Sequence, residues 1–312
     1  MAFAFVFPGQ GSQSVGMMAA YGDSSIVRST FDEASVVLGQ DLWQLVAEGP
    51  AELLAQTVNT QPLMLTAAIA AYRLWLEKGG AVPAIVAGHS LGEYSALVAA
   101  EVLDFKDAVP LVRLRATAMQ EAVPLGNGGM AAILNLDDDK IREACTEAAT
   151  EVGNGAVVEL VNFNAPGQTV IAGSKTAVER ACEGCKARGA KRAVLLPVSA
   201  PFHSSLLRPA AEKLGTRLAE LNFAVPKIRV VNNVDVVIET DPEKIKNALI
   251  RQAFSPVRWV ETVQKIAALG VTTVAECGPG KVLAGLVKRC ADGVVGVALA
   301  DAASIEANLN LE

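Results

Sequence analysis

Residues 83–101 combine an apolar run, a glycine-rich pentapeptide and a helical pattern, and no other segment restricts the fold as strongly. The run Pro-Ala-Ile-Val-Ala at 83–87 predicts a buried strand, and residues 91–101 predict a helix. The pentapeptide Gly-His-Ser-Leu-Gly at 88–92 lies between them and has the form Gly-x-Ser-x-Gly, in which the glycines permit a sharp turn. A strand, a tight turn and a helix in this order indicate an α/β protein.

The same alternation of apolar runs and helical patterns continues at both ends of the sequence. It predicts βα units around a parallel sheet that is flanked by helices. The expected strands are 3–7, 83–87, 271–277 and 293–299, and the expected helices are 59–80, 91–101, 258–270 and 281–290.

Residues 127–199 follow a different order. The expected strands are 130–136, 156–164, 168–173 and 192–199, and the expected helices are 138–151 and 175–189. The order βαββαβ is that of a ferredoxin-like module. We therefore predict a large, hydrolase-like α/β domain made of residues 1–126 and 200–312, with a small ferredoxin-like subdomain at 127–199 inserted into it.

Composition excludes several classes of function. The net charge of −6 argues against nucleic acid as a partner, and no apolar run reaches the length of a membrane span. The N-terminus lacks a basic segment and is typical of a first strand and not of a signal peptide, so we expect a location in the cytoplasm, or in a plastid stroma if a transit peptide has been removed. We also expect a monomer. The five cysteines are scattered and suggest neither disulfides nor a metal site, so we expect no metal.

Ser90 is the candidate nucleophile. Its place between a strand and a helix would expose the hydroxyl at a helix N-terminus, where free N–H groups stabilise a developing oxyanion. The alternative is a glycine-rich bend whose serine only caps the helix.

A serine nucleophile needs a base, and the chain contains only two histidines. His89 is adjacent to Ser90, and neighbouring side chains diverge in a sharp turn, so we expect it to be structural and to bond within the turn. His203, in the segment Pro-Phe-His-Ser-Ser at 201–205, is then the remaining candidate, unless it is a hydrogen-bonded core histidine.

Arg115 is the third candidate. Spacing in the helical segment 110–124 places it with Val112 and Met119 on an apolar face. A buried guanidinium is costly unless it meets an anion. That anion is either an internal Asp or Glu or a substrate carboxylate bound bidentately, and the residues alone leave both open.

Eight segments that span essentially the whole chain carry a further signal through their joint order and spacing. They are FVFPGQGSQ (5–13), TQP (60–62), GHSLGEYSAL (88–97), LVRLRATAMQ (111–120), NFNAPGQTVIAG (162–173), PFHSSLL (201–207), RQAFSPVRW (251–259) and ECGPGKVLAGL (276–286). In this order they resemble the malonyl-CoA:acyl-carrier-protein transacylases and the related acyltransferase domains of polyketide synthases.

The resemblance implies a ping-pong transfer of malonyl from malonyl-CoA to the phosphopantetheine thiol of an acyl carrier protein, with no cofactor. Ser90 would carry the ester, His203 would be the base and Arg115 would bind the malonyl carboxylate. The remaining implied roles are an oxyanion hole from the backbone N–H groups of Gln10 and Leu91, a main-chain carbonyl of Gln252 that orients His203, and a substrate pocket that includes Phe202, Asn162 and Met130.

Phe202 departs from many bacterial members, which have serine before the histidine. Related domains that select malonyl over methylmalonyl carry phenylalanine there, so we expect malonyl preference.

Carrier proteins are typically acidic, and the densest basic cluster that could bind one is Lys186, Arg188, Lys191 and Arg192. The alternative is an ordinary solvated helix end.

Two other functions share part of the pattern. An α/β-hydrolase-type esterase or thioesterase also has Gly-x-Ser-x-Gly, but its acid and histidine follow in that order, with the histidine usually near the C-terminus. More than 100 residues follow His203 here. A catalytically silent, carrier-binding subunit is the other alternative.

Overall fold

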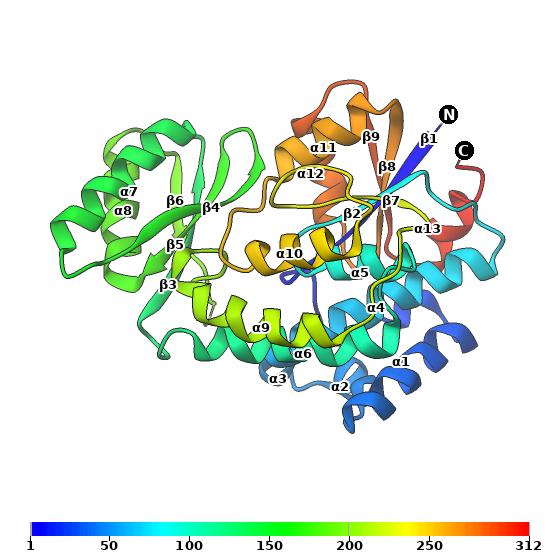
Figure 1. The fold of residues 1–312 in the computed structure, drawn as a ribbon. Helices are drawn as coiled ribbons and strands as arrows, with labels where there is room; N and C mark the ends of the chain where they lie inside the picture. Colours follow the sequence, from blue (N-terminus) through cyan, green and yellow to red (C-terminus); the bar gives the residue numbers. More distant parts are fainter. Residues whose placement is uncertain (1, 199, 312) are drawn as a thin grey trace.

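The computed structural model describes residues 2–198 and 200–311, whose strands form two separate sheets (Figure 1). The larger sheet contains the chain's first two strands and its last three. The smaller sheet contains the four strands between them and lies to one side of it, together with two helices. This arrangement confirms the predicted α/β fold with a parallel sheet flanked by helices.

The larger sheet is entirely parallel, with the order β7-β2-β1-β8-β9. Phe7 pairs with Gly88 at the carboxyl ends of β1 and β2, so the loops that follow these two strands emerge side by side. Its strands are β1 (Ala2–Phe7), β2 (Ile85–Gly88), β7 (Arg229–Val231), β8 (Val271–Cys277) and β9 (Val295–Leu299).

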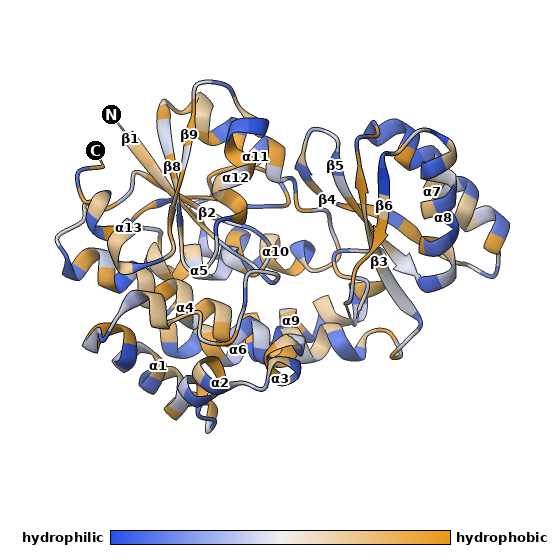
Figure 2. Cartoon of the chain, turned by 180° about the vertical axis from the view of Figure 1, so that it is seen from behind, coloured by the Kyte–Doolittle hydropathy of each residue, from blue (hydrophilic) through white to orange (hydrophobic). Residues whose placement is uncertain are grey.

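Strand β1 shows why this sheet is buried on both faces. Phe3, Phe5 and Phe7 belong to the core on one face, where Phe5 packs edge-on against Tyr72 and Trp75. Ala4 and Val6 alternate with them and belong to the core on the opposite face. Both sets are apolar, as expected for a parallel strand covered by helices on two sides, and Figure 2 shows the resulting hydrophobic colouring of the sheet.

Helices cover both faces of this sheet. α4 and α5 contact one face, with α1, α6 and α9 packed around them, while α11 and α12 cover the other. The helices are α1 (Ser25–Leu38), α2 (Leu42–Glu48), α3 (Ala51–Ala55), α4 (Thr57–Glu77), α5 (Gly92–Ala99), α6 (Phe105–Glu121), α7 (Asp138–Val152), α8 (Lys175–Ala187), α9 (Arg208–Glu220), α10 (Pro242–Gln252), α11 (Trp259–Ala268), α12 (Val282–Cys290) and α13 (Ala302–Ala307), with short 3-10 turns η1 (Ala19–Tyr21) and η2 (Ser205–Leu207).

The smaller sheet is antiparallel, and its order is β4-β5-β3-β6. One face packs against α7 and α8. The other face presents Met130, Val161, Val170 and Ala172, which pack with Phe202 from beyond the sheet. The strands are β3 (Gly128–Leu134), β4 (Val158–Ala165), β5 (Gln168–Ser174) and β6 (Arg192–Leu195), so the elements follow the expected order βαββαβ. The exact domain boundaries, and the ferredoxin-like description, stay predictions.

Two details differ from expectation. The last strand of the smaller sheet ends at Leu195. Leu196 N–H still donates to the Met130 oxygen, but the Val198 N–H donates to the Leu196 oxygen and not to β3, and residue 199 of the expected strand lies outside the described residues. Strand β7 is three residues long, which is too short to show a periodic pattern in the sequence. Within the described part of the chain, no helix is both long enough and apolar enough to cross a bilayer.

Candidate active site

Ser90 lies in the turn between β2 and α5 and has a φ of +52°. Glycine is required on both sides of it. A Cβ on Gly88 would lie 1.9 Å from the Gly92 carbonyl, and one on Gly92 would lie 2.0 Å from the Phe7 oxygen. The Ser90 N–H donates to Asn233 Oδ1 over 2.8 Å, which fixes the turn from the loop after β7. Ser90 itself therefore has a left-handed backbone conformation, and the backbone packs closely at the glycines on either side of it.

His203 follows the smaller sheet in the sequence, whereas Ser90 precedes it, yet the two side chains meet. Its Nε2 is 2.7 Å from Ser90 Oγ, although the two residues are 113 positions apart. Its Nδ1 is 2.8 Å from the main-chain oxygen of Gln252, which can only accept a hydrogen bond. Nδ1 therefore carries the proton, and Nε2 presents a lone pair to the serine hydroxyl. His203 also has a positive φ of 65°, a conformation typical of functional sites.

The electrostatic environment keeps His203 neutral. Burial in the protein, and then the positive charge of Arg115, lower the pKa of His203 from 6.5 to about 3. A neutral imidazole is the form that can accept the proton of Ser90. No Asp or Glu side chain bonds this histidine within residues 2–198 and 200–311, and a main-chain carbonyl orients the ring instead.

Arg115 projects from α6 into the same site. Its side chain is 2% exposed, on the buried face that the helical spacing predicted. It donates to Gln61 Oε1 over 2.8 Å, to Gln252 Oε1 over 2.9 Å and to Ser90 Oγ over 3.1 Å. No carboxylate lies within 4.0 Å of it in the described part of the chain, so the internal ion pair left open above is absent there.

Two backbone N–H groups at the carboxyl ends of β1 and β2 lie at the edge of this site. They belong to Gln10 and Leu91, and neither donates a hydrogen bond to another described residue. The two turns touch, because a Cβ on Gly9 would lie 2.6 Å from the His89 oxygen. The Gln10 side chain accepts from Thr57 Oγ1 over 2.9 Å, which holds the turn after β1 against α4.

A cavity of about 310 Å³ opens in front of these groups. Met130 and Val170 contribute the wall from the smaller sheet, so the pocket lies between the two sheets. Phe202 packs against apolar residues of both cores beside His203. The cavity is lined by Gln10, Gly11, Gln13, Gln61, His89, Ser90, Leu91, Arg115, Met130, Asn162, Val170, Leu196, Pro197, Val198, Phe202 and His203.

His89 bonds farther away than expected. Its Nε2 lies 2.8 Å from Asn164 Oδ1 on β4, so this contact reaches the smaller sheet and not only the turn. Its ring lies 5.4 Å from the Trp259 ring, and burial lowers its pKa. The residue is a buried connection between the two sheets.

Four polar groups around the site escaped the sequence analysis. Asn233 contacts the Ser90 turn, Gln61 contacts Arg115, and the side chain of Gln252 contacts both Arg115 and the Ser90 oxygen. Glu93 bonds Gln252 and Asn233 in turn. Amide side chains have no local signature, and only the Gly-x-Ser-x-Gly-Glu sequence could have drawn attention to Glu93.

The expected carrier-binding cluster has mixed surroundings. Arg188 is 2.5 Å from Glu147 of α7, so its charge is already paired. Lys186 lies at the end of α8, and Lys191 and Arg192 are exposed where β6 begins. Carrier binding by this cluster stays a prediction. The five cysteines are buried and free, and no metal-binding group of His, Cys, Asp or Glu is found among the described residues.

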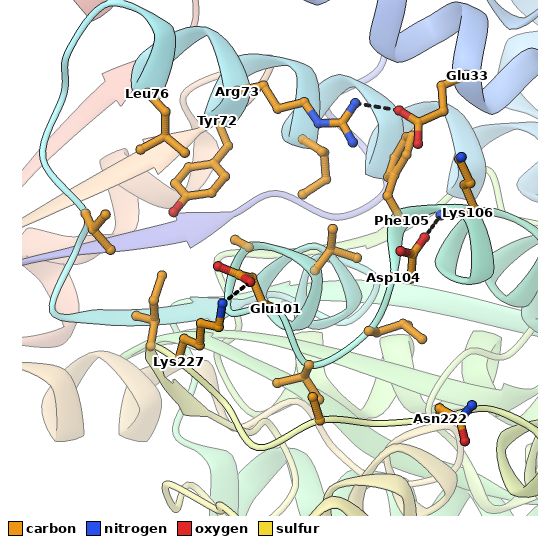
Figure 3. A pocket seen from close by; sticks show the side chains of 18 residues that line it. Glu33, Tyr72, Arg73, Leu76, Glu101, Asp104, Phe105, Lys106, Asn222 and Lys227 are labelled. Atoms are coloured by element: carbon orange, nitrogen blue, oxygen red, sulfur yellow. Dashed lines mark hydrogen bonds and ion pairs between the residues drawn. The ribbon is translucent and has the colours of Figure 1, made fainter.

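A larger hollow of about 820 Å³ lies at the opposite end of the larger sheet (Figure 3). Its residues precede β2 and β7 or belong to the helices around them, whereas Ser90 follows β2. Figure 3 shows Arg73 joined to Glu33 and Lys227 joined to Glu101. Arg73 and Lys227 thus have carboxylate partners, in contrast to Arg115.

Comparisons with known proteins agree on one family. The acyl transferase domain family matches residues 4–305. "Malonyl CoA-acyl carrier protein transacylase" of Salmonella typhimurium is 56% identical over 308 residues, 98% of each chain. The crystal structure of acyl-carrier-protein S-malonyltransferase from Burkholderia pseudomallei is 62% identical and has a TM-score of 0.97 over 100% of both chains. A type II PKS acyl-carrier protein in complex with its malonyl-transacylase is 53% identical, with a TM-score of 0.97 and the same coverage.

Proposed function

The chain belongs to the acyl transferase domain family, and we propose from this premise that it transfers malonyl from malonyl-CoA to an acyl carrier protein through an ester on Ser90. It is an acyltransferase, and the product would supply extender units for fatty-acid or polyketide synthesis. The relatives support the substrates by name, and one of them was solved with its carrier protein.

One observation carries the choice of malonyl. Arg115 is buried, contacts the Ser90 hydroxyl directly and bonds the neutral side chains of Gln61 and Gln252, with no carboxylate bonded to it among the described residues. Burial lowers its pKa, which means that the charged form is incompletely compensated. A carboxylate on the acyl group would supply the missing anion, and a guanidinium binds it with two parallel hydrogen bonds. Acetyl groups have no such carboxylate.

The first half of the reaction forms the ester. The lone pair on His203 Nε2 accepts the proton of Ser90, and Oγ attacks the thioester carbonyl of malonyl-CoA. The N–H groups of Gln10 and Leu91 donate to the oxyanion of the tetrahedral intermediate. When the carbon–sulfur bond breaks, His203 returns the proton to the sulfur, and CoA leaves as the free thiol.

The second half reverses these steps with a new thiol. His203 takes the proton of the phosphopantetheine thiol, whose sulfur attacks the malonyl-Ser90 ester. The same N–H groups stabilise the second oxyanion, and Ser90 leaves with the proton from His203. The Gln252 carbonyl accepts from Nδ1 throughout and favours the imidazolium that forms in each half.

Arg115 also favours transfer to a thiol over hydrolysis. By holding the carboxylate at the bottom of the cavity, it orients the ester carbonyl toward the open side, where the carrier arm enters. The apolar wall of Met130, Val170 and Phe202 limits the water that can approach from the other side.

Phe202 would set the preference for malonyl over methylmalonyl. Phe202 lines the cavity together with His203, so its ring would limit the room for a branch on the acyl Cα. One methyl group changes binding in an apolar pocket by about 10- to 200-fold. Phe202→Ala is expected to raise the ratio of methylmalonyl to malonyl kcat/KM by about 10-fold, measured with both CoA esters in competition. Equal use of the two donors by the wild-type enzyme would remove this role.

Intact mass spectrometry tests the proposed reaction. The protein is incubated with malonyl-CoA, weighed, and then mixed with a phosphopantetheinylated carrier protein. A malonyl adduct that moves to the carrier is the expected result. Rapid loss of the adduct to water would instead indicate a hydrolase, and no adduct would indicate a silent carrier-binding subunit.

Three finer expectations belong to the same proposal. We expect no cofactor, a monomeric enzyme and a cytoplasmic location. Light scattering tests the monomer, and cell fractionation tests the location.

For the carrier surface, the double substitution Lys191→Glu and Arg192→Glu is expected to raise the KM for the carrier protein, because its acidic surface would be repelled. An unchanged KM would exclude this surface.

A further inference from the structure

Glu93 is a buried carboxylate in the first turn of α5, three residues after Ser90, and the reaction described above does not use it. Its side chain is 2% exposed. Oε2 accepts from the Gln252 side-chain Nε2 over 2.8 Å and from the Asn233 backbone N over 3.0 Å. Burial raises the pKa of Glu93 to about 7, so holding a carboxylate here has an energetic cost that its hydrogen bonds offset.

The Gln252 side chain links Glu93 to Arg115. An amide has a donor end and an acceptor end. The Nε2 end donates to Glu93 and to the Ser90 oxygen, the latter over 3.0 Å. Because a carboxylate only accepts, it fixes which end of the amide faces it. Oε1 is therefore directed to Arg115, whose Nη2 donates to it over 2.9 Å.

This chain of contacts keeps Glu93 and Arg115 one amide apart. Glu93 in direct contact with the guanidinium would occupy the N–H groups that a substrate carboxylate needs. With Gln252 between them, the two charges still attract each other, and Arg115 has no bonded carboxylate in the described part of the chain.

Asn233 extends the same network to the Ser90 turn. Its backbone N donates to Glu93, its Oδ1 accepts from the Ser90 N–H, and its Nδ2 donates to the Gly88 oxygen over 2.7 Å. One carboxylate oxygen thus bonds the two residues that hold the nucleophile's turn and the arginine.

We propose that Glu93 is a positioning residue that fixes the Gln252 amide and, through it, orients Arg115 toward the malonyl carboxylate. This role rests on the proposed malonyl transfer. It predicts that Glu93 matters for donors that use Arg115 and much less for the intrinsic reactivity of Ser90 and His203.

Two variants of Glu93 separate orientation from simple folding. Glu93→Gln keeps an acceptor oxygen and the side-chain volume, whereas Glu93→Ala removes the partner of Gln252. Losing a buried acceptor typically changes an equilibrium by about 10- to 100-fold, so Glu93→Ala is expected to lower kcat/KM for malonyl-CoA by about that factor. Glu93→Gln is expected to retain kcat/KM within about threefold of wild type, since one amide oxygen can accept both bonds.

The control reaction is inactivation by phenylmethylsulfonyl fluoride, an uncharged serine reagent that needs Ser90 and His203 but not Arg115. Its rate is expected to change by less than about threefold in both variants. Glu276→Gln is the matched control, because Glu276 is also buried, its pKa is also raised to about 7 by burial, and it bonds the Ala284 N–H and not Gln252. It is expected to leave malonyl kcat/KM unchanged.

Three results would overturn the proposal. They are equal losses of malonyl transfer and sulfonylation in Glu93→Ala, a Glu93→Gln variant as impaired as Glu93→Ala, and a Glu276→Gln variant as impaired as either. A wild-type protein that reacts with phenylmethylsulfonyl fluoride but forms no malonyl ester would instead contradict the proposed function itself.

Discussion

The two ends of the larger sheet each carry a hollow, and they differ in chemistry more than in size. The hollow at the amino ends of β2 and β7 has about 820 Å³, and the cavity at the carboxyl ends of β1 and β2 has about 310 Å³. In the larger one Arg73 and Lys227 each meet a carboxylate, whereas in the smaller one Arg115 is buried among neutral groups. The uncompensated charge marks the candidate site, and the volume does not.

The backbone differs in the same way. The carboxyl-end cavity is lined by the tight turns after β1 and β2, and ligand sites at the carboxyl ends of strands are general for parallel sheets. The amino-end hollow is bounded by helix ends and a loop whose side chains bond one another. The following predictions test whether this contrast corresponds to function.

Ser90→Ala should have the largest effect. Removing the only proposed nucleophile is expected to lower transfer by more than about 10⁴-fold and to abolish the malonyl adduct in the intact mass. Circular dichroism checks that the fold persists. If this variant still gained the mass of a malonyl group, the acyl group would have to be attached to a residue other than Ser90.

Substituting one arginine by alanine in each hollow gives the most direct comparison of the two hollows. Arg115→Ala is expected to lower kcat/KM for malonyl-CoA by about 30- to 3,000-fold, because a buried carboxylate would lose its charged partner. Arg73→Ala removes an arginine that is paired with Glu33 over 2.7 Å, and transfer should stay within about twofold. Similar losses in both variants would erase the distinction between the hollows.

The pH dependence of Ser90 labelling reports the charge around His203. Because the pKa of His203 is lowered to about 3, its neutral form persists as the pH falls, so labelling by phenylmethylsulfonyl fluoride should be nearly constant from pH 7.5 to 5.5. A histidine at its usual pKa of 6.5 would lose about 10-fold over this range. Arg115→Met removes a cause of the lowering, so the acid limb should move to higher pH.

The lowered pKa of His203 has a different consequence for folding stability, which should depend on pH. Below pH 6.5 the unfolded chain binds a proton at this histidine that the folded chain does not, so stability falls as the pH decreases. Labelling is therefore measured only where circular dichroism shows a folded protein. A tenfold fall in labelling of the folded enzyme at pH 5.5 would contradict the neutral base.

Lys227→Ala should have the smallest effect. Its bond to Glu101 joins two exposed side chains, and such pairs contribute about 0–1 kcal/mol. We expect transfer within about twofold of wild type and a shift of less than about 0.5 kcal/mol in urea unfolding. A clear loss of transfer would assign a role to the amino-end hollow.

The sequence predicted those parts of the molecule that a local pattern determines. The strand, glycine turn and helix around Ser90 follow from spacing, and so does the buried face of α6 that holds Arg115. His203 came from elimination, because the chain has two histidines and one is adjacent to the serine.

The network behind these residues could not be predicted in this way. Asn233 contacts Ser90 across 143 positions, and Gln252 contacts Arg115 across 137. An amide in a loop or at a helix end has no periodicity, and its partners are set only when the sheet brings distant loops together. The hydrogen bond from His89 to β4 escaped for the same reason.

The order of the site's residues along the chain has a consequence for its synthesis. Ser90 and Arg115 are translated before the smaller sheet, whereas His203, Asn233 and Gln252 all follow it. A ribosome-bound chain that ends near residue 200 has the serine but neither its base nor the residues that fix its turn. We therefore expect a nascent chain to be inert toward acyl-CoA until His203, Asn233 and Gln252 have been synthesised and have packed against Ser90 and Arg115.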